Sequence, residues 1–288
     1  MATTTGSGAP SPVDTHRGGL RRSIDLFRAF RVEQTDPDHF YRIQAADAVA
    51  QLRRYAPVDG RVVIDVGGGG GYFTEAFVAA GARCVLVEPS AGAPDDPAPE
   101  RAARDPAHPT GAEAARQEHH RRAIRPGRLA RGRTVAGDGN RLPLPDAVAD
   151  VVFSSNVLEH VPDPDRFLDE MVRVTRPQGT VYLSFTAWFS PWGGHETAPW
   201  HYLGGHRAAR RYERRHGRLP GNHFGTSLFV CHVGASLRMA RAHPGVEVVA
   251  ALPRYYPDWL RWIVAVPVVR EVATWNLLLV LRRRGTTP

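Results

Sequence analysis

Short apolar runs bounded by glycine, proline and charged residues recur along the chain and predict seven β-strands. We place these strands at 62–66, 83–88, 134–136, 150–154, 180–185, 246–252 and 276–281. Apolar residues at helical spacing instead mark 20–31, 39–55 and 72–80, and Asp36 followed by Pro37 is a helix-start signal. Strands that alternate with helices are typical of an α/β fold with a mostly parallel sheet.

The turn after the first predicted strand contains five consecutive glycines. Asp65 lies in that strand, and Gly67, Gly69 and Gly71 follow at alternate positions before a helical pattern begins. Glycine permits positive φ and a close approach of the backbone to a ligand, and a helix N-terminus presents free N–H groups. The turn therefore predicts a nucleotide-cofactor site. Because the run also satisfies the looser G-x-G-x-x-G template through Gly68, the turn alone leaves the cofactor open.

Polar residues follow the next strands at their carboxyl ends. Glu88 ends the second strand, 17 residues after Gly71, where a carboxylate can accept hydrogen bonds from both hydroxyls of a ribose. Asp138 and Gly139 come after the third strand. The fourth strand leads into Asn156 and then into Leu-Glu-His-Val-Pro-Asp-Pro.

These ordered blocks resemble the class I S-adenosylmethionine-dependent methyltransferases, in the subgroup with an LPxxDxxxDxVxxxxxLEHVxDP signature. The resemblance implies a Rossmann-like, seven-stranded, mostly parallel sheet with helices on both faces, and S-adenosylmethionine as cofactor. It implies that the methionine part of the cofactor is surrounded by Asp65, Gly67, Gly69 and Gly71, and that Glu88 binds the ribose. It also implies that Asp138 and Gly139 face the adenine and that Asn156 lies beside the sulfonium.

A second resemblance covers the region that follows the predicted core. Gly-Gly-His-Glu at 193–196, His-Tyr-Leu-Gly-Gly at 201–205 and Asn-x-Phe-Gly-x-Ser-Leu-Phe at 222–229 are similar to a group of actinobacterial, including mycobacterial, class I methyltransferases. We expect a disordered tail at 1–19 and one methyltransferase domain at 20–288. Within it we expect a helical lid at 20–58, a cofactor-binding core at 60–186 with a Pro- and Ala-rich insertion at 90–111, and a substrate half at 187–288.

The start of the substrate half is rich in tryptophan and histidine. Three residues of each kind occur within 188–206, on a Gly- and Pro-rich segment after the fifth strand. Methyl transfer to a hydroxyl needs a positioned nucleophile and a base that removes its proton. His195 and Glu196 are the first candidates for that base, His201 is the next, and His160 is a weaker candidate because it can instead brace the following helix. We expect O-methylation of a small or medium acceptor, such as a sugar, a polyketide, a lipid-linked molecule or an aromatic metabolite.

His195, Glu196, His201 and His206 could be ligands of a metal ion. Their spacing is not His-Glu-x-x-His, and five-residue intervals on a segment interrupted by glycine do not place the side chains on one helix face. We therefore expect no metal ion.

Composition removes several classes of function. All 37 basic residues are arginine, so a lysine Schiff base and a Walker-type Gly-Lys-Ser/Thr loop are excluded. The net charge is +8, with arginine clusters in 121–133, 207–218 and 282–284. No nucleic-acid motif accompanies them, and the Asn/Asp-Pro-Pro-Tyr/Phe motif of amino-directed nucleic-acid methyltransferases is absent. We therefore interpret the charge as a solvated surface and disfavour nucleic acid as a partner.

Two cysteines, Cys84 and Cys231, provide no disulfide framework, and no signal peptide is visible, so we expect a cytoplasmic enzyme. The aromatic segment 255–270 contains an apolar run of eight residues, Trp262 to Val269, which is far shorter than the ~20 residues of a membrane-spanning helix. Core packing is the favoured interpretation of this segment, and peripheral contact with a membrane is the second.

Two other functions remain open at this point. A non-catalytic module could keep the fold and bind S-adenosylmethionine without a base near the sulfonium, and a nicotinamide-dependent oxidoreductase could share the strand, glycine turn and acid. The sequence contains no residue that decides the oligomeric state.

Overall fold

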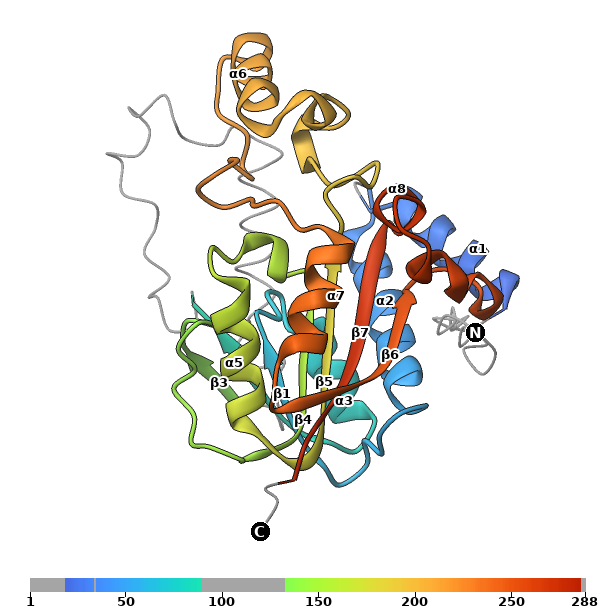
Figure 1. The fold of residues 1–288 in the computed structure, drawn as a ribbon, viewed down its shortest axis with the longest axis vertical. Coiled ribbons are helices and arrows are strands. Elements are labelled where there is room, and N and C mark those ends of the chain that lie inside the picture. Colours follow the sequence, from blue (N-terminus) through green and yellow to red (C-terminus); the bar gives the residue numbers. More distant parts are fainter. Residues whose placement is uncertain (1–18, 34, 90–132, 286–288) are drawn as a thin grey trace, which may run out of the picture.

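The computed structural model describes residues 19–33, 35–89 and 133–285 of the chain. The predicted insertion at 90–111 and all but the last residue of the predicted tail at 1–19 lie outside this part. The centre of the fold is a seven-stranded sheet with strand order β3-β2-β1-β4-β5-β7-β6 (Figure 1). The strands are β1 (Val62–Val66), β2 (Arg83–Glu88), β3 (Arg133–Ala136), β4 (Ala149–Ser155), β5 (Thr175–Thr186), β6 (Val246–Pro253) and β7 (Asn276–Arg283).

The strands pair in parallel from β3 across to β5, while β7 runs antiparallel to both β5 and β6. All seven predicted strands are present, and the predicted Rossmann-like, mostly parallel sheet is confirmed. The strands were visible in the sequence because sheets covered on both faces need long apolar runs. In β7, Leu277, Leu279 and Leu281 face one core, and Leu278 and Val280 face the other.

Helices cover both faces of the sheet (Figure 1). The helices α5 (Pro164–Val174) and α7 (Val233–Ala242) pack on one face, and α2 (Pro37–Leu52) and α3 (Tyr72–Ala79) pack on the other. The remaining helices are α1 (Leu20–Arg31), α6 (Gly205–His216) and α8 (Val269–Ala273), with 3₁₀ turns η2 (Leu158–His160), η3 (His195–Thr197), η4 (Trp200–Leu203) and η5 (Asp258–Ala265).

The predicted helical lid has two different parts. Helix α2 begins where Asp36 accepts a hydrogen bond from the backbone N–H of His39 at 3.0 Å, with Pro37 in the first turn. Its Ala45, Ala48 and Leu52 are buried against the sheet, so α2 is part of the helical layer that covers this face of the sheet. Helix α1 has exposed apolar side chains and is the outer helix of the pair.

A long excursion leaves the sheet after β5 and returns at α7. It spans residues 187–232 and contains η3, η4 and α6, which lies at the end of the molecule farthest from the C-terminus (Figure 1). At its base, the backbone N–H of Trp188 donates to the carbonyl of Cys231 at 2.8 Å. This hydrogen bond brings the two ends of the excursion together beside β5.

The aromatic segment near the C-terminus is only partly buried. Ile263 and Val264 pack in the core, but the side chains of Trp259 and Trp262 are 67% and 51% exposed. The expectation of core packing is therefore correct for Ile263 and Val264 and wrong for the two tryptophans, because η5 turns one side toward solvent. It is also wrong for Val266 and Val268, which follow η5 and are exposed. Among the helices that the structure describes, none has the length and apolarity needed to cross a bilayer.

A buried ion pair attaches α1 to the rest of the fold. The guanidinium of Arg22 donates to both carboxylate oxygens of Asp47 in α2, at 2.5 and 2.7 Å, and to the backbone carbonyl of Arg254 after β6 at 3.0 Å. The side chains of Arg22 and Asp47 are 5% and 1% exposed. Two helices and one strand end therefore meet at one guanidinium, whose planar fork matches a carboxylate.

We predict that Arg22→Ala lowers the free energy of unfolding by roughly 3 to 5 kcal/mol, because it leaves the Asp47 carboxylate buried without its cation. Urea denaturation measures this loss. The exposed neighbour Arg21 provides the control, and Arg21→Ala should change stability by less than about 0.5 kcal/mol. Equal effects of the two substitutions would contradict the role of the buried pair.

Candidate active site

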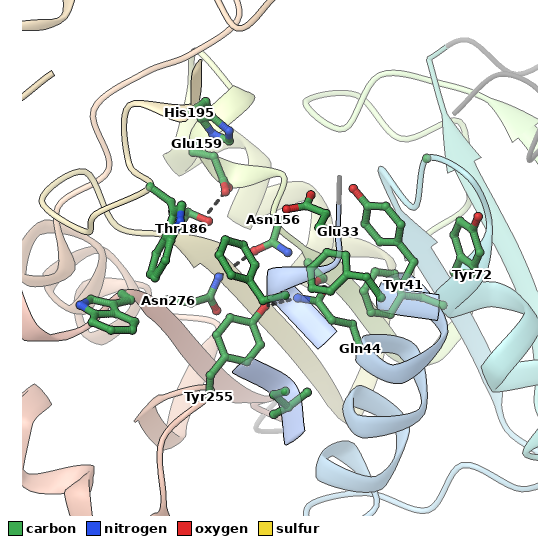
Figure 2. A pocket seen from close by; sticks show the side chains of 18 of the residues that line it. Glu33, Tyr41, Gln44, Tyr72, Asn156, Glu159, Thr186, His195, Tyr255 and Asn276 are labelled. Atoms are coloured by element: carbon green, nitrogen blue, oxygen red, sulfur yellow. Dashed lines mark hydrogen bonds between the residues drawn. The ribbon is translucent and has the colours of Figure 1, made fainter. Parts of the chain in front are cut away.

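A large cavity lies at the carboxyl edge of the parallel strands, where open α/β sheets bind ligands. Its volume is about 1160 Å³, above the roughly 300–1,000 Å³ of common small-molecule sites. Its wall includes the glycine turn, part of α1 and α2, the residues after β4, and five residues of the excursion: Trp192, His195, Glu196, Gly221 and Asn222. Figure 2 shows Tyr41 and Tyr72 on one side of the cavity and Glu159 and His195 on another. The cavity has room for two ligands side by side.

The glycine turn forms one end of the cavity. Gly67, Gly69 and Gly71 have φ values of 73°, 50° and 76°, a conformation that L side chains rarely adopt. At Gly68 a Cβ atom would lie 2.3 Å from a carboxylate oxygen of Asp65, so this position also excludes a side chain. Because Gly67 through Gly70 line the cavity, a ligand there meets backbone instead of side chains. The turn therefore fits a cofactor that needs close backbone contact.

Asp65 lies directly beneath the turn and is completely buried. Its Oδ2 accepts a hydrogen bond from the Thr74 hydroxyl at 2.7 Å, while Oδ1 has no hydrogen-bond partner among the described residues. Burial raises the pKa of this carboxyl to about 7, the Thr74 hydroxyl opposes the rise, and the charge of Glu88 adds to it. Asp65 therefore supports the turn from below and does not line the cavity.

The predicted ribose and adenine residues surround the turn but do not line the cavity. Glu88 accepts a hydrogen bond from the backbone N–H of Gly69 at 3.1 Å, so the second strand is connected to the glycine turn. Asp138 accepts from the N–H of Asn140 at 2.9 Å. A Cβ atom on Gly139 would lie 2.4 Å from the ring of Phe167, so this glycine allows the segment after β3 to pack closely on α5. Glu88 ends β2, and Asp138 and Gly139 follow β3, so all three lie at the carboxyl ends of two neighbouring parallel strands.

Asn156 lines the cavity and connects β4 to β7. Its backbone has a φ of 57°, and its N–H donates to the carbonyl of Ser184 at 2.8 Å. The side-chain Oδ1 accepts from Nδ2 of Asn276, the first residue of β7, at 2.7 Å (Figure 2). Both side-chain amides line the cavity, so the cavity wall at the carboxyl end of β4 contains two polar side chains that are hydrogen-bonded to each other.

The other end of the cavity contains Glu159, His160, His195 and Glu196. Glu159 and His160 follow β4 in η2, and the other two begin η3 in the excursion. One ligand-capable atom from each of Glu159, His160 and His195 lies within 4.8 Å of the other two. Burial raises the pKa of the Glu159 carboxyl, and the neighbouring His160 opposes this rise. The carboxylate of Glu196 accepts from Nδ2 of Asn222 at 2.9 Å.

His201 and His206 occupy other positions. The side chain of His201 is fully buried, its Nε2 lies 3.2 Å from the carbonyl of Ser190, and burial lowers its pKa. His206 packs edge-on against Phe224, with ring centroids 4.8 Å apart. Neither histidine lines the cavity, so His195, Glu196, His201 and His206 are not brought together.

Sequence reasoning did not single out several cavity residues. Glu159 stands next to His160 in the Leu-Glu-His-Val block, and its adjacency to a candidate histidine after a strand was the available signal. Gln44, whose Nε2 donates to the Tyr255 hydroxyl at 3.2 Å, and Asn276 come from segments whose patterns indicated a helix and a strand only. A local sequence pattern cannot predict these hydrogen bonds, because the partners of Asn276 and Gln44 lie 120 and 211 residues away in sequence.

The raised pKa of Asp65 predicts a specific pH dependence of stability. Since its pKa in the folded protein exceeds the ~3.9 of an unfolded chain, the folded state binds the proton more tightly, and the free energy of unfolding falls as pH rises toward about 7. Between pH 5 and pH 8, the stability of the wild type should fall by roughly 2 to 3 kcal/mol relative to Asp65→Asn. Urea denaturation without cofactor measures this difference, and the exposed Asp165→Asn should follow the wild type.

Comparisons with known proteins identify the family. Residues 64–183, from β1 into β5, match the methyltransferase domain family. The chain is 45% identical over 274 residues to an uncharacterized methyltransferase of Mycobacteroides abscessus, covering 93% of this chain and 96% of that one. It is 44% identical over 279 residues to an uncharacterized methyltransferase of Mycobacterium tuberculosis, covering 95% of this chain and 99% of that one.

Among solved structures, an S-adenosylmethionine dependent methyltransferase from Mesorhizobium loti superposes with a TM-score of 0.50 and 19% identity, covering 83% of this chain and 98% of that one. At this identity the likeness concerns the fold alone. The predicted resemblance is confirmed by the identity to mycobacterial methyltransferases along almost the whole chain. The chain belongs to the methyltransferase domain family and is an S-adenosylmethionine-dependent methyltransferase.

Proposed function

We propose that this methyltransferase transfers a methyl group to a hydroxyl of a small or medium acceptor bound at the His160, His195 and Glu196 end of the cavity. The observation that carries the proposal is the cavity itself. A single space of about 1160 Å³ extends from a glycine turn without side chains to a group of histidines and a carboxylate. The first end suits a cofactor, and the second suits an acceptor that must lose a proton.

The cofactor roles follow the family resemblance. S-adenosylmethionine, when bound, supplies an electrophilic methyl group on a sulfonium sulfur. We assign the methionine part to the glycine turn above Asp65, the ribose to Glu88 and the adenine side to Asp138 and Gly139. Asn156, held by Asn276 at 2.7 Å, is placed beside the reacting atoms because both amides line the cavity between its two ends.

Glu196 is our choice for the residue that accepts the proton of the acceptor hydroxyl. Its Oε1 is oriented by the amide of Asn222, and its Oε2 is buried with no hydrogen-bond partner among the described residues. A carboxylate oriented through one oxygen keeps the other for the acceptor. His160 and His195 line the same end and would contact the acceptor oxygen, whereas the burial of His201 supports a structural role for that residue.

The walls of the cavity favour an acceptor with an apolar or aromatic body. Ile24, Phe27 and Phe30 of α1 form one part of the lining. Trp192 packs edge-on against Phe30 and against Trp275, with ring centroids 4.7 and 4.9 Å apart. Aromatic faces and edges of this kind bind rings and apolar chains. A hydroxylated aromatic metabolite or a lipid-linked acceptor fits this lining better than a bare sugar.

We predict that S-adenosylmethionine binds the wild type in the micromolar range, about −8 kcal/mol, and that Glu88→Ala weakens binding about 100-fold. Glu88→Gln keeps an acceptor oxygen for one hydroxyl and should lose only about 10-fold. Isothermal titration calorimetry measures both, with exposed Glu247→Ala as the matched control. Wild-type affinity in Glu88→Ala would remove the ribose assignment.

We also predict that Glu196→Gln reduces turnover by at least ~100-fold with little change in the affinity for S-adenosylmethionine. Glutamine keeps the size of the side chain and an acceptor for Asn222 but cannot take a proton. Formation of S-adenosylhomocysteine is measured with a catechol, a monophenol, a sugar and a hydroxylated long-chain lipid. Exposed Glu213→Gln should behave as wild type. Full activity of Glu196→Gln on the best acceptor would exclude Glu196 as the base.

A further inference from the structure

We infer that Glu159, His160 and His195 form a binding site for a divalent first-row transition-metal ion at the acceptor end of the cavity. The inference rests on the proposed function, since the ion would lie where the acceptor is expected to bind. It differs from the sequence expectation of no metal, which considered His195 with Glu196, His201 and His206. The structure brings a different trio together.

The trio has a suitable size and donor set. One side-chain atom from each residue lies within 4.8 Å of the other two. Metal–ligand bonds of about 2.0–2.2 Å in tetrahedral geometry place ligand atoms about 3.3–3.6 Å apart, so side-chain rotations that bring these atoms about 1 Å closer would close the site. Two imidazoles and one carboxylate are the donors found in catalytic zinc sites and in iron sites with open positions. All three residues line the cavity, so an ion there would be accessible to an acceptor.

Glu159 supplies the independent observation that points to a ligand. Its side chain is 2% exposed, and its Oε1 accepts a hydrogen bond from the backbone N–H of Thr186 at 3.0 Å (Figure 2). Its Oε2 is buried with no hydrogen-bond partner among the described residues. An unsatisfied buried oxygen costs about 1–3 kcal/mol, more when charged. A cation at Oε2 would compensate this carboxylate.

His160 is oriented as metal-binding histidines are. Its Nδ1 lies 2.6 Å from the backbone carbonyl of Ser227, which can only accept, so Nδ1 carries a proton and Nε2 is the nitrogen that has the lone pair in the neutral ring. The segment that contains Ser227 is itself fixed next to η2, because the backbone N–H of Phe229 donates to the backbone carbonyl of Glu159 at 2.8 Å. Two of the three proposed ligands are therefore positioned by the same stretch of the excursion.

His195 comes from η3 in the excursion, whereas Glu159 and His160 come from η2. It begins η3 with a φ of 47°, which is unusual for a residue with a side chain, and its ring centroid lies 5.1 Å from that of His160. Such backbone conformations cost about 1–3 kcal/mol and occur most often at functional sites. The strain is consistent with a position selected to direct the imidazole toward His160 and Glu159.

The donor set also selects the ion and its effect. Imidazole nitrogens favour Zn²⁺ and Co²⁺ over Mn²⁺ and Mg²⁺, which prefer oxygen ligands. Three protein ligands leave at least one coordination position open for an acceptor hydroxyl. Coordination lowers the pKa of a bound hydroxyl, so the adjacent carboxylate of Glu196 could accept its proton near neutral pH. The metal site and the proposed base thus act on the same oxygen.

The test is a metal titration of the untagged protein after treatment with a chelator. Isothermal titration calorimetry with Zn²⁺, and the visible absorption of Co²⁺, should show one site per chain, with Mg²⁺ at least ~10-fold weaker. Glu159→Gln and His195→Gln should each weaken Zn²⁺ binding by at least ~100-fold. His206→Gln, a histidine of the same excursion outside the trio, should bind as wild type. Circular dichroism verifies folding, and His195→Gln decides the test if Glu159→Gln does not fold.

The outcomes separate the metal site from the proposed function. Absence of 1:1 Zn²⁺ or Co²⁺ binding to the wild type, with and without S-adenosylmethionine, would overturn the metal site. An equal loss of Zn²⁺ affinity in His206→Gln would also overturn the metal site. If S-adenosylmethionine still binds and a hydroxyl acceptor is methylated by the chelated protein, the proposed function stands without the metal. If metal binds as expected but no hydroxyl acceptor is methylated, the proposed function fails while the metal site remains.

Discussion

The reversal of β7 is the constraint on which the arrangement of the site depends. Because β7 runs antiparallel between β5 and β6, its first residue lies at the carboxyl edge of the parallel strands. Asn276 can therefore bond Asn156 after β4, and its carbonyl accepts from the N–H of Arg254 after β6. The carbonyl of Trp275 accepts from Ala187 at the start of the excursion. A parallel β7 would begin at the opposite edge, and these connections would be lost.

The two ends of the cavity use opposite means of recognition. At the glycine turn, side chains are absent and the wall of the cavity is backbone, supported by the buried Asp65 and by Glu88 on the Gly69 amide. At the other end, side chains form the wall and the backbone orients them, through Thr186 on Glu159 and Ser227 on His160. A cofactor shared across a family suits the first arrangement. An acceptor that differs among relatives suits the second.

The fold was predictable where neighbours in sequence determine the outcome. Apolar runs such as 276–281 predict buried strands because both faces of the sheet are covered, and the five glycines predict the turn. The site was harder to predict from the sequence because the residues that contact one another there are far apart in sequence. The hydrogen bond between Asn156 and Asn276 joins residues 120 positions apart, and the approach of His195 to Glu159 depends on the path of the excursion. His201 and His195 stand in the same Gly-rich segment, but only packing distinguishes the buried ring from the one in the cavity.

The hydrogen bond between Trp188 and Cys231 has an evolutionary consequence. It closes the base of the excursion, so the 42 residues between these two positions meet the sheet through a fixed neck. Since the entropy of closing a loop changes only slowly with its length, insertions and deletions above such a neck have little effect on the stability of the sheet. The excursion can therefore change in length and sequence while the sheet and the glycine turn stay the same. The neck makes the excursion a separable unit of variation.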